Sequence, residues 1–193
     1  MRRGACTVRL AAALLSGVLG CDDGPPPGPA VEPPPEWNEE SAREAEDLAG
    51  RLEASSGVVG AELSVRLAFG AGADLDLYVT GPQEETVYYA NTPSGIGGEL
   101  LEDRRCVHDT PRIETARFPA PLMPGRYRIG IDYPHACSDA KAPMPFALRV
   151  DEPGGHHEFQ GLAAHRVFEA VVLEFEIGVA PVVGARQVEE VDR

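Results

Sequence analysis

Several acidic and amide side chains near the middle of the chain are potential ligands of a cation. Asp74 and Asp76 alternate with leucines, so in a β-strand both carboxylates project from the same outward face. Asn91, Glu102 and Asp103 can reach them from nearby loops. Ca²⁺ takes about six to eight hard oxygen ligands of this kind. The pattern predicts a calcium site; the alternative is a solvated strand face, with Asp74 binding backbone amides of the preceding glycine-rich turn.

Aromatic residues suggest a second kind of binding surface. Tyr78, Tyr88 and Tyr89 lie close together in the sequence, and with Trp37 they can offer stacking faces to sugar rings. The alternative is that these tyrosines pack across neighbouring strands of a sheet.

Catalytic patterns are weak. Ser138 and Lys141 match the Ser-x-x-Lys pattern of penicillin-recognising enzymes, but the accompanying Lys-Thr-Gly motif is absent. The sequence has no Gly-x-Ser-x-Gly motif and no phosphate-binding loop. An enzyme would need a cleft that unites His135, Asp132 and a nucleophile, and we expect none.

The N-terminus indicates where the protein acts. A basic start and an apolar run over residues 10–19 have the order of a secretory signal, and the run is too short to span a membrane as a helix. Residues 18–21, Val-Leu-Gly-Cys, resemble the lipobox of bacterial lipoproteins. The resemblance implies removal of residues 1–20, acylation of Cys21 and attachment to a membrane of the bacterial cell envelope, in a leaflet that the sequence does not decide. The alternative is an ordinary cleaved signal with an incidental cysteine.

Two further cysteines lie in the exported part. Cys106-Val-His108 and His135-Ala-Cys137 form a mirrored pair. An oxidising envelope favours a disulfide between Cys106 and Cys137, the two cysteines left once the signal and the lipidated residue are assigned. Because each cysteine also shares a strand face with a histidine, a Cys₂His₂ zinc site is the alternative.

The charge balance limits the partners. The chain has 17 basic and 31 acidic residues, and loss of the three arginines of the signal leaves 14 basic residues and a net charge of −17. Such a chain is repelled by phosphate backbones and by anionic lipid surfaces. The composition therefore excludes nucleic acid as a partner and leaves acyl chains as the means of membrane attachment.

The residues named above need a particular series of elements to position them. Residues 21–37 hold the lipidated end and a proline-rich linker. Residues 38–56 predict a short helix that Asn38 or Ser41 can cap. Residues 180–193 are expected to form a flexible tail.

Residues 57–179 predict a β-sandwich domain. Apolar and polar residues alternate over five stretches, at 63–69, 74–79, 126–133, 146–150 and 167–177. Glycine- and proline-rich turns separate these stretches. Short half-buried strands at this spacing indicate an all-β antiparallel sandwich of about seven or eight strands.

Several short motifs between residues 63 and 150 carry a family resemblance. They are Asp-Leu-Asp-Leu-Tyr-Val-Thr-Gly-Pro at 74–82, Tyr-Tyr-Ala-Asn at 88–91, Gly-Gly-Glu-Leu at 97–100 and Pro-Gly-Arg-Tyr at 124–127. Together they resemble the YfaP-like domain of unknown function in bacterial envelope and secreted proteins. Tyr78 departs from the family's usual histidine, and residues 111–114 depart from its Pro-Glu-Asn-Ile. The resemblance implies a β-sandwich and says little about activity.

These observations together predict a lipid-anchored bacterial cell-envelope protein. We expect it to display a disulfide-stapled β-sandwich for binding or structural display and not for catalysis, with an envelope protein or a glycan as its partner. The alternative is a calcium-dependent or carbohydrate-binding module of the envelope. Apart from calcium we expect no cofactor.

Overall fold

The structure is a computed structural model that describes residues 37–55 and 57–178. The expected signal peptide, Cys21, the linker up to residue 36 and the expected tail lie outside these residues. The described elements are α1 (Glu39–Ala54), β1 (Leu63–Phe69), β2 (Ala73–Thr80), β3 (Thr86–Val87), β4 (Glu99–Leu100), β5 (Arg112–Phe118), β6 (Gly125–Ala136), β7 (Met144–Glu152), β8 (Gly155–Ala163) and β9 (Phe168–Ile177).

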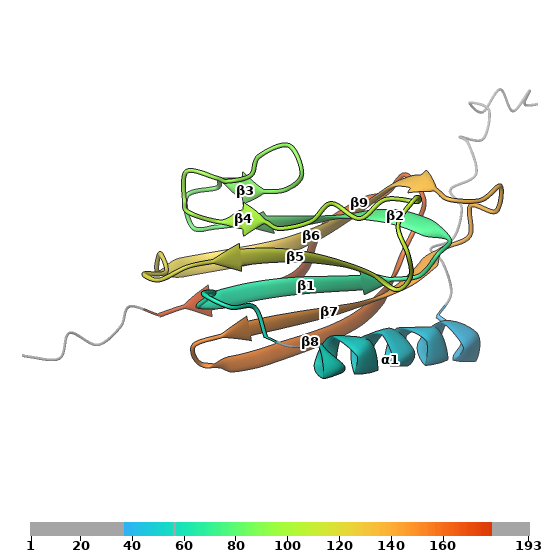
Figure 1. Cartoon of the computed structure of the whole chain (residues 1–193), viewed down its shortest axis with the longest axis horizontal. Coiled ribbons are helices and arrows are strands. Elements are labelled where there is room, and N and C mark those ends of the chain that lie inside the picture. The colour runs from blue at the N-terminus through green and yellow to red at the C-terminus, as the bar shows by residue number, and fades with distance from the viewer. Residues whose placement is uncertain (1–36, 56, 179–193) are drawn as a thin grey trace, which may run out of the picture. The chain divides into compact units, whose positions relative to one another are not determined.

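The described strands form two antiparallel sheets that face each other (Figure 1). The first sheet has the order β4-β5-β1-β7-β8, and the second has the order β3-β2-β6-β9. This arrangement confirms the predicted all-β sandwich with one short helix. The strands number nine in the described part, and two of them, β3 and β4, are only two residues long.

Helix α1 forms because its first turn is capped and one of its faces is apolar. The Asn38 side chain accepts hydrogen bonds from two backbone amides of the first turn, both at 3.0 Å, which confirms Asn38 as the N-cap. Leu48 and Leu52 pack on Ala68 of β1 and Ala147 of β7, which lie opposite each other in the first sheet. Because both alanine side chains are small, the helix can pack closely on the sheet.

The other end of α1 is held by a residue of β1. The Arg66 guanidinium donates to the carbonyl oxygen of Leu52 at 3.1 Å, satisfying one of the carbonyls that a helix leaves free at its end. Arg66 also forms an ion pair with Asp151 of β7 at 2.9 Å. This outward face of β1, which the alternation suggested was solvated, is buried because the helix covers it.

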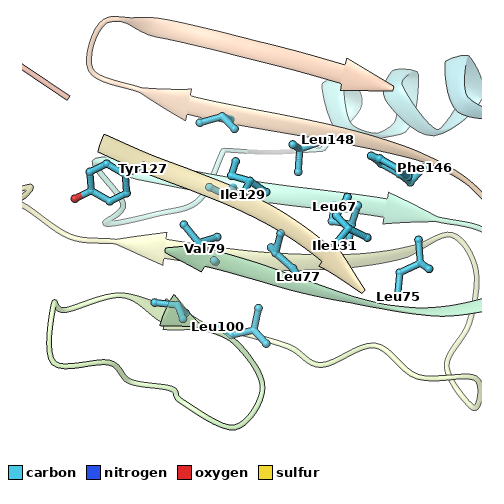
Figure 2. Close-up of a cluster of buried hydrophobic side chains, with 14 of the residues drawn as sticks. Leu67, Leu75, Leu77, Val79, Leu100, Tyr127, Ile129, Ile131, Phe146 and Leu148 are labelled. Atoms are coloured by element: carbon cyan, nitrogen blue, oxygen red, sulfur yellow. The ribbon is translucent and has the colours of Figure 1, made fainter. Parts of the chain in front are cut away.

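The core lies between the two sheets and follows the alternation read from the sequence. Figure 2 shows side chains of both sheets meeting there, among them Leu67 of β1, Leu77 of β2, Ile129 of β6 and Leu148 of β7. The alternation fails at the start of β9, because the register between β6 and β9 shifts between Ile129 and Ile131. As a result Val171 is exposed, and the core receives Phe175 and Ile177 from the second half of that strand.

The turn from β1 to β2 carries the chain from the first sheet to the second. Its carbonyl groups point toward Arg112, the first residue of β5, which donates to Gly70 at 3.0 Å, Ala71 at 3.1 Å and Ala73 at 2.9 Å. Arg112 also donates to the carbonyl of Cys106 at 2.9 Å. One buried guanidinium therefore ties this turn to the segment before β5.

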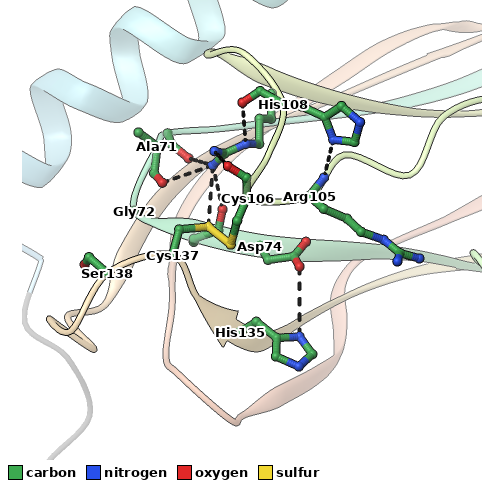
Figure 3. The surroundings of a disulfide bond; sticks show 12 residues. Ala71, Gly72, Asp74, Arg105, Cys106, His108, His135, Cys137 and Ser138 are labelled. Atoms are coloured by element: carbon green, nitrogen blue, oxygen red, sulfur yellow. Dashed lines mark hydrogen bonds and ion pairs between the residues drawn. A yellow bond between two sulfur atoms is a disulfide. The ribbon is translucent and has the colours of Figure 1, made fainter.

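A disulfide reinforces the same corner, that is, the β1–β2 turn and the segment before β5. Cys106 is bonded to Cys137 at the end of β6, with the two Cα atoms 5.3 Å apart. Figure 3 shows the bond beside the β1–β2 turn at Ala71 and Gly72. Because the two sulfur atoms are bonded to each other, this pair offers no thiolate to the zinc ion considered as the alternative.

Replacing both cysteines by the pair Cys106→Ser and Cys137→Ser should lower the free energy of unfolding by about 3 to 4 kcal/mol. This is the loop-closure entropy expected for a bridge between residues 31 positions apart. Denaturant unfolding of the two proteins under identical conditions measures the difference. An unchanged midpoint would contradict the stabilising role of the bridge.

Candidate functional site

Strand β2 places two carboxylates on the outer face of the second sheet. Leu75 and Leu77 point into the core, so Asp74 and Asp76 point away from it, as the alternation predicted. Both aspartates are nevertheless only 9% exposed. The segment between β4 and β5, residues 101–111, accounts for this burial because it brings Asp103 against them.

Strand β6 adds two more titratable side chains to this face. Asp132 lies directly opposite Asp76, and His135 lies opposite Asp74. The register shifts between the two pairs, so β6 holds one residue more than β2 in this interval. The His135 Nδ1 atom is 3.9 Å from a carboxylate oxygen of Asp74, and Figure 3 shows these two side chains turned toward each other.

These residues line a cavity of about 220 Å³. We call it the acid cavity; its lining consists of Asp74, Asp76, Tyr89, Asp103, Arg105, Asp132, Pro134 and His135. Asp74, Asp76 and Asp103 each place one carboxylate oxygen within 4.8 Å of the other two. Two oxygens bound to one Ca²⁺ at about 2.4 Å lie at most about 4.8 Å apart, so this spacing fits a shared calcium ion.

Two of the carboxylates have unused hydrogen-bonding capacity. The side chain of Asp76 receives no hydrogen bond and forms no ion pair with any of the described residues, although it is buried. One oxygen of Asp74 is also buried without a hydrogen-bond partner in this part of the chain. Buried polar atoms are almost always paired in folded proteins. Asp103 differs, because it is held by the guanidinium of Arg105.

The electrostatics of the acid cavity raise the pKa values of Asp74 and Asp76. Burial, with repulsion from the other three aspartates, raises the pKa of Asp76 to about 7, while Arg105 acts in the opposite direction. Burial and the charge of Asp103 also raise the pKa of Asp74. A cation among these groups would remove both causes of instability, since it supplies the missing partner and neutralises the repulsion.

Two of the predicted calcium ligands lie elsewhere. The Asn91 side chain donates to the carbonyl of Thr86 at 2.8 Å and closes its own turn. Glu102 forms an ion pair with Arg104. Neither residue lines the acid cavity. The structure does not bring these two side chains to the other three acids, because loop geometry, which residue spacing does not reveal, sets where they point.

Asp132 lines the acid cavity in their place; sequence reasoning considered it only for a catalytic cleft with His135 and not as a cation ligand. It alternates with the core residues Ile131 and Tyr133, so its outward direction was readable from the sequence. What was missing was the pairing of β2 with β6, which puts Asp132 next to Asp76.

Glu114 of β5 holds residues 101–111, the covering segment between β4 and β5. Sequence reasoning also missed this residue. It is 1% exposed, and its carboxylate accepts from the backbone amides of Leu77 and Arg104, both at 2.9 Å. Burial raises its pKa to about 8, against the effect of these two hydrogen bonds. Because Leu77 belongs to β2 and Arg104 to the covering segment, this one side chain joins the two walls of the acid cavity.

The four residues of the predicted aromatic surface do not all lie together. Tyr89 lines the acid cavity, and Tyr78 and Tyr88 stack beside it with ring centres 5.1 Å apart. Trp37 lies just before α1, which packs on the other sheet. A larger cavity of about 550 Å³ lies beside Arg66 and Asp151, whose charges already pair with each other.

Comparison with family models, with curated proteins and with solved structures finds no match. The resemblance to the YfaP-like domain therefore stays a prediction. Across residues 37–55 and 57–178, no helix combines the length and the apolar character needed to cross a membrane.

In a buffer that contains a chelator, the free energy of unfolding should fall as the pH rises from about 4 to about 7. The reason is that the folded state holds a proton on Asp76 up to a pKa of about 7, whereas the unfolded chain releases it near its usual value of 3.8. Asp76→Asn should flatten this part of the profile. The control Asp139→Asn, at an exposed position outside the cavity, should keep the wild-type slope. Equal slopes in the wild type and Asp76→Asn, measured by denaturant unfolding at each pH, would contradict the assignment.

Proposed function

We propose that this protein is a lipid-anchored binding module of the bacterial cell envelope and that its acid cavity binds Ca²⁺. The observation that carries the cation is the pair of carboxylates on β2: one oxygen of Asp74 is buried with no hydrogen-bond partner among the described residues, and Asp76 beside it receives no hydrogen bond there and faces three further carboxylates. A group of this kind is costly without a ligand, because burial penalises an unpaired charge.

The composition of the acid cavity favours calcium over magnesium. Mg²⁺ keeps several of its waters and usually takes one or two carboxylates, whereas Ca²⁺ accepts more carboxylates in a flexible geometry. Asp74, Asp76 and Asp103 are close enough to share one ion, and Asp132 lies next to them. The remaining coordination positions would be left to water or to oxygen atoms of a bound partner.

Binding accounts for this site better than catalysis does. His135 and Asp132 both line the acid cavity, but its lining among the described residues contains no serine, threonine or cysteine. Ser138, which matched an enzyme motif, donates instead to the nearby carbonyl of Ala140 at 3.2 Å. A Ser–His–Asp or Cys–His arrangement has no nucleophile here.

The membrane anchor is supported by the N-terminal sequence. Residues 18–21 have the lipobox pattern directly after an apolar run, and a proline-rich linker follows. With a net charge of −17 after processing, the chain has little attraction for an anionic membrane surface, so acyl chains are the physical means of attachment.

The Cys21→Ser variant should leave the membrane fraction or accumulate as an unprocessed precursor, because the acyl acceptor is gone. Cys6→Ser provides a matched control, since it changes a cysteine inside the signal and should leave processing and membrane retention intact. Fractionation and the intact mass of both variants report the outcome. Normal processing and full membrane retention of Cys21→Ser would show that the anchor proposal is mistaken.

Calcium should raise the melting temperature of the full chain, purified from membranes in detergent, by several degrees. A ligand at about 100 times its dissociation constant stabilises the folded state by about 2.7 kcal/mol. Asp76→Asn should lose most of the shift, and Asp139→Asn should keep it. Magnesium at equal ionic strength controls for nonspecific attraction to an acidic protein. Equal shifts with the two ions, or a full calcium shift in Asp76→Asn, would count against a calcium site.

A further inference from the structure

A second hollow lies on the outer face of the second sheet, next to the acid cavity. It has a volume of about 380 Å³ and is lined by residues of all four strands of that sheet and of the turn between β2 and β3. We call it the aromatic groove. The residues that matter for its chemistry are Tyr78, Thr80, Glu84, Tyr88, Arg128 and Phe168.

Three rings form the apolar part of the aromatic groove. Tyr78 and Tyr88 stack with ring planes 16° apart, and the Phe168 ring centre lies 4.9 Å from that of Tyr78. Gly130, opposite Tyr78 on β6, makes room for this packing, because a Cβ atom there would lie 3.2 Å from the Phe168 ring. Phe168 is nevertheless 52% exposed. The sheet therefore keeps a large aromatic surface in contact with water.

Polar groups stand around these rings. Arg128 of β6 forms an ion pair with Glu84, which belongs to the turn between β2 and β3. The hydroxyl groups of Thr80 and Thr86 lie 2.8 Å apart and share a hydrogen bond. The aromatic groove thus combines ring faces with a carboxylate, a guanidinium and two hydroxyl groups, and its charges balance within one ion pair.

We propose that the aromatic groove binds an uncharged sugar ring of an oligosaccharide. A pyranose has an apolar face of C–H groups, which suits an aromatic ring, and a rim of hydroxyl groups that both donate and accept. Glu84 can accept from such hydroxyls and Arg128 can donate to them. A phosphorylated or sulfated ligand fits less well, because the groove's one cation is already paired and the whole chain is strongly acidic.

The aromatic groove adjoins the acid cavity through two neighbouring tyrosines. Tyr88 lines the groove, Tyr89 lines the acid cavity, and their rings meet edge to face with centres 5.3 Å apart. An oligosaccharide of a few residues could therefore extend from the groove toward the acid cavity. Sugar binding in the aromatic groove needs no cation, so it can be tested separately from calcium binding in the acid cavity.

Titration calorimetry of the full chain, in a detergent without a sugar headgroup, tests the proposal. The probes are three neutral trisaccharides, of glucose in α- and β-linkage and of N-acetylglucosamine, with a sulfated oligosaccharide for comparison. At least one neutral probe should bind, with calcium and also with chelator. Phe168→Ala should weaken its binding about tenfold, the loss that corresponds to about 1.4 kcal/mol of stacking energy.

Two further variants separate recognition from folding. Phe168→Trp should bind like the wild type because it keeps an aromatic face. Phe159→Ala, which removes an exposed phenylalanine from β8 of the first sheet, should leave the affinity unchanged. The proposal is overturned if no neutral probe binds, if the sulfated probe binds best, or if Phe168→Ala and Phe159→Ala bind equally well. Binding that chelator abolishes and Phe168→Ala leaves intact would also overturn it, since the sugar would then sit in the acid cavity.

Discussion

The buried guanidinium of Arg112 is the interaction on which the outer face of the second sheet depends. A turn that crosses from one sheet to the other cannot satisfy its carbonyl groups within a ladder, and Arg112, 3% exposed, takes three of them. A fourth donation, to Cys106, attaches the segment that carries Asp103. The disulfide fixes the same segment covalently to the end of β6. This corner, together with Glu114, which accepts from the amide of Arg104, holds Asp103 against Asp74 and Asp76.

Glu114 and Arg112 are buried charged residues of the same strand, and both have hydrogen-bond partners, which Asp76 lacks among the described residues. Both point into the sandwich from β5, where charged side chains are expensive to bury. Hydrogen bonds to backbone groups compensate each of them: carbonyl groups accept from the charged Arg112, and amides donate to Glu114. Asp76 is less deeply buried and receives no hydrogen bond from the described residues. The first two residues are held by the fold itself, whereas the carboxylate of Asp76 stays available to the ion proposed above.

The sequence predicted those parts of the molecule in which side chains alternate regularly. The strands around Leu67, Leu77 and Ile129 and the cap at Asn38 follow from local pattern, and the disulfide was predicted from the expected oxidising compartment. Strand β5 was missed because Arg112 and Glu114 occupy positions where a core-facing pattern requires apolar residues. Strand β8 was missed because most of its residues are exposed at a sheet edge. Within the acid cavity, the two aspartates on β2 and Asp103 on the following loop were predicted from the sequence, but Asp132, which strand pairing brings beside them, was not predicted as a cation ligand.

The packing of α1 on the first sheet depends on two strands that are far apart in the sequence. Its docking surface combines Ala68 of β1 with Ala147 of β7, and its last turn is bound by Arg66, which is itself paired with Asp151. Strand β7 is separated from α1 by about 90 residues of sequence. The surface on which α1 packs therefore exists only where β1 and β7 are paired, so the contacts of α1 with the sheet depend on a non-local pairing.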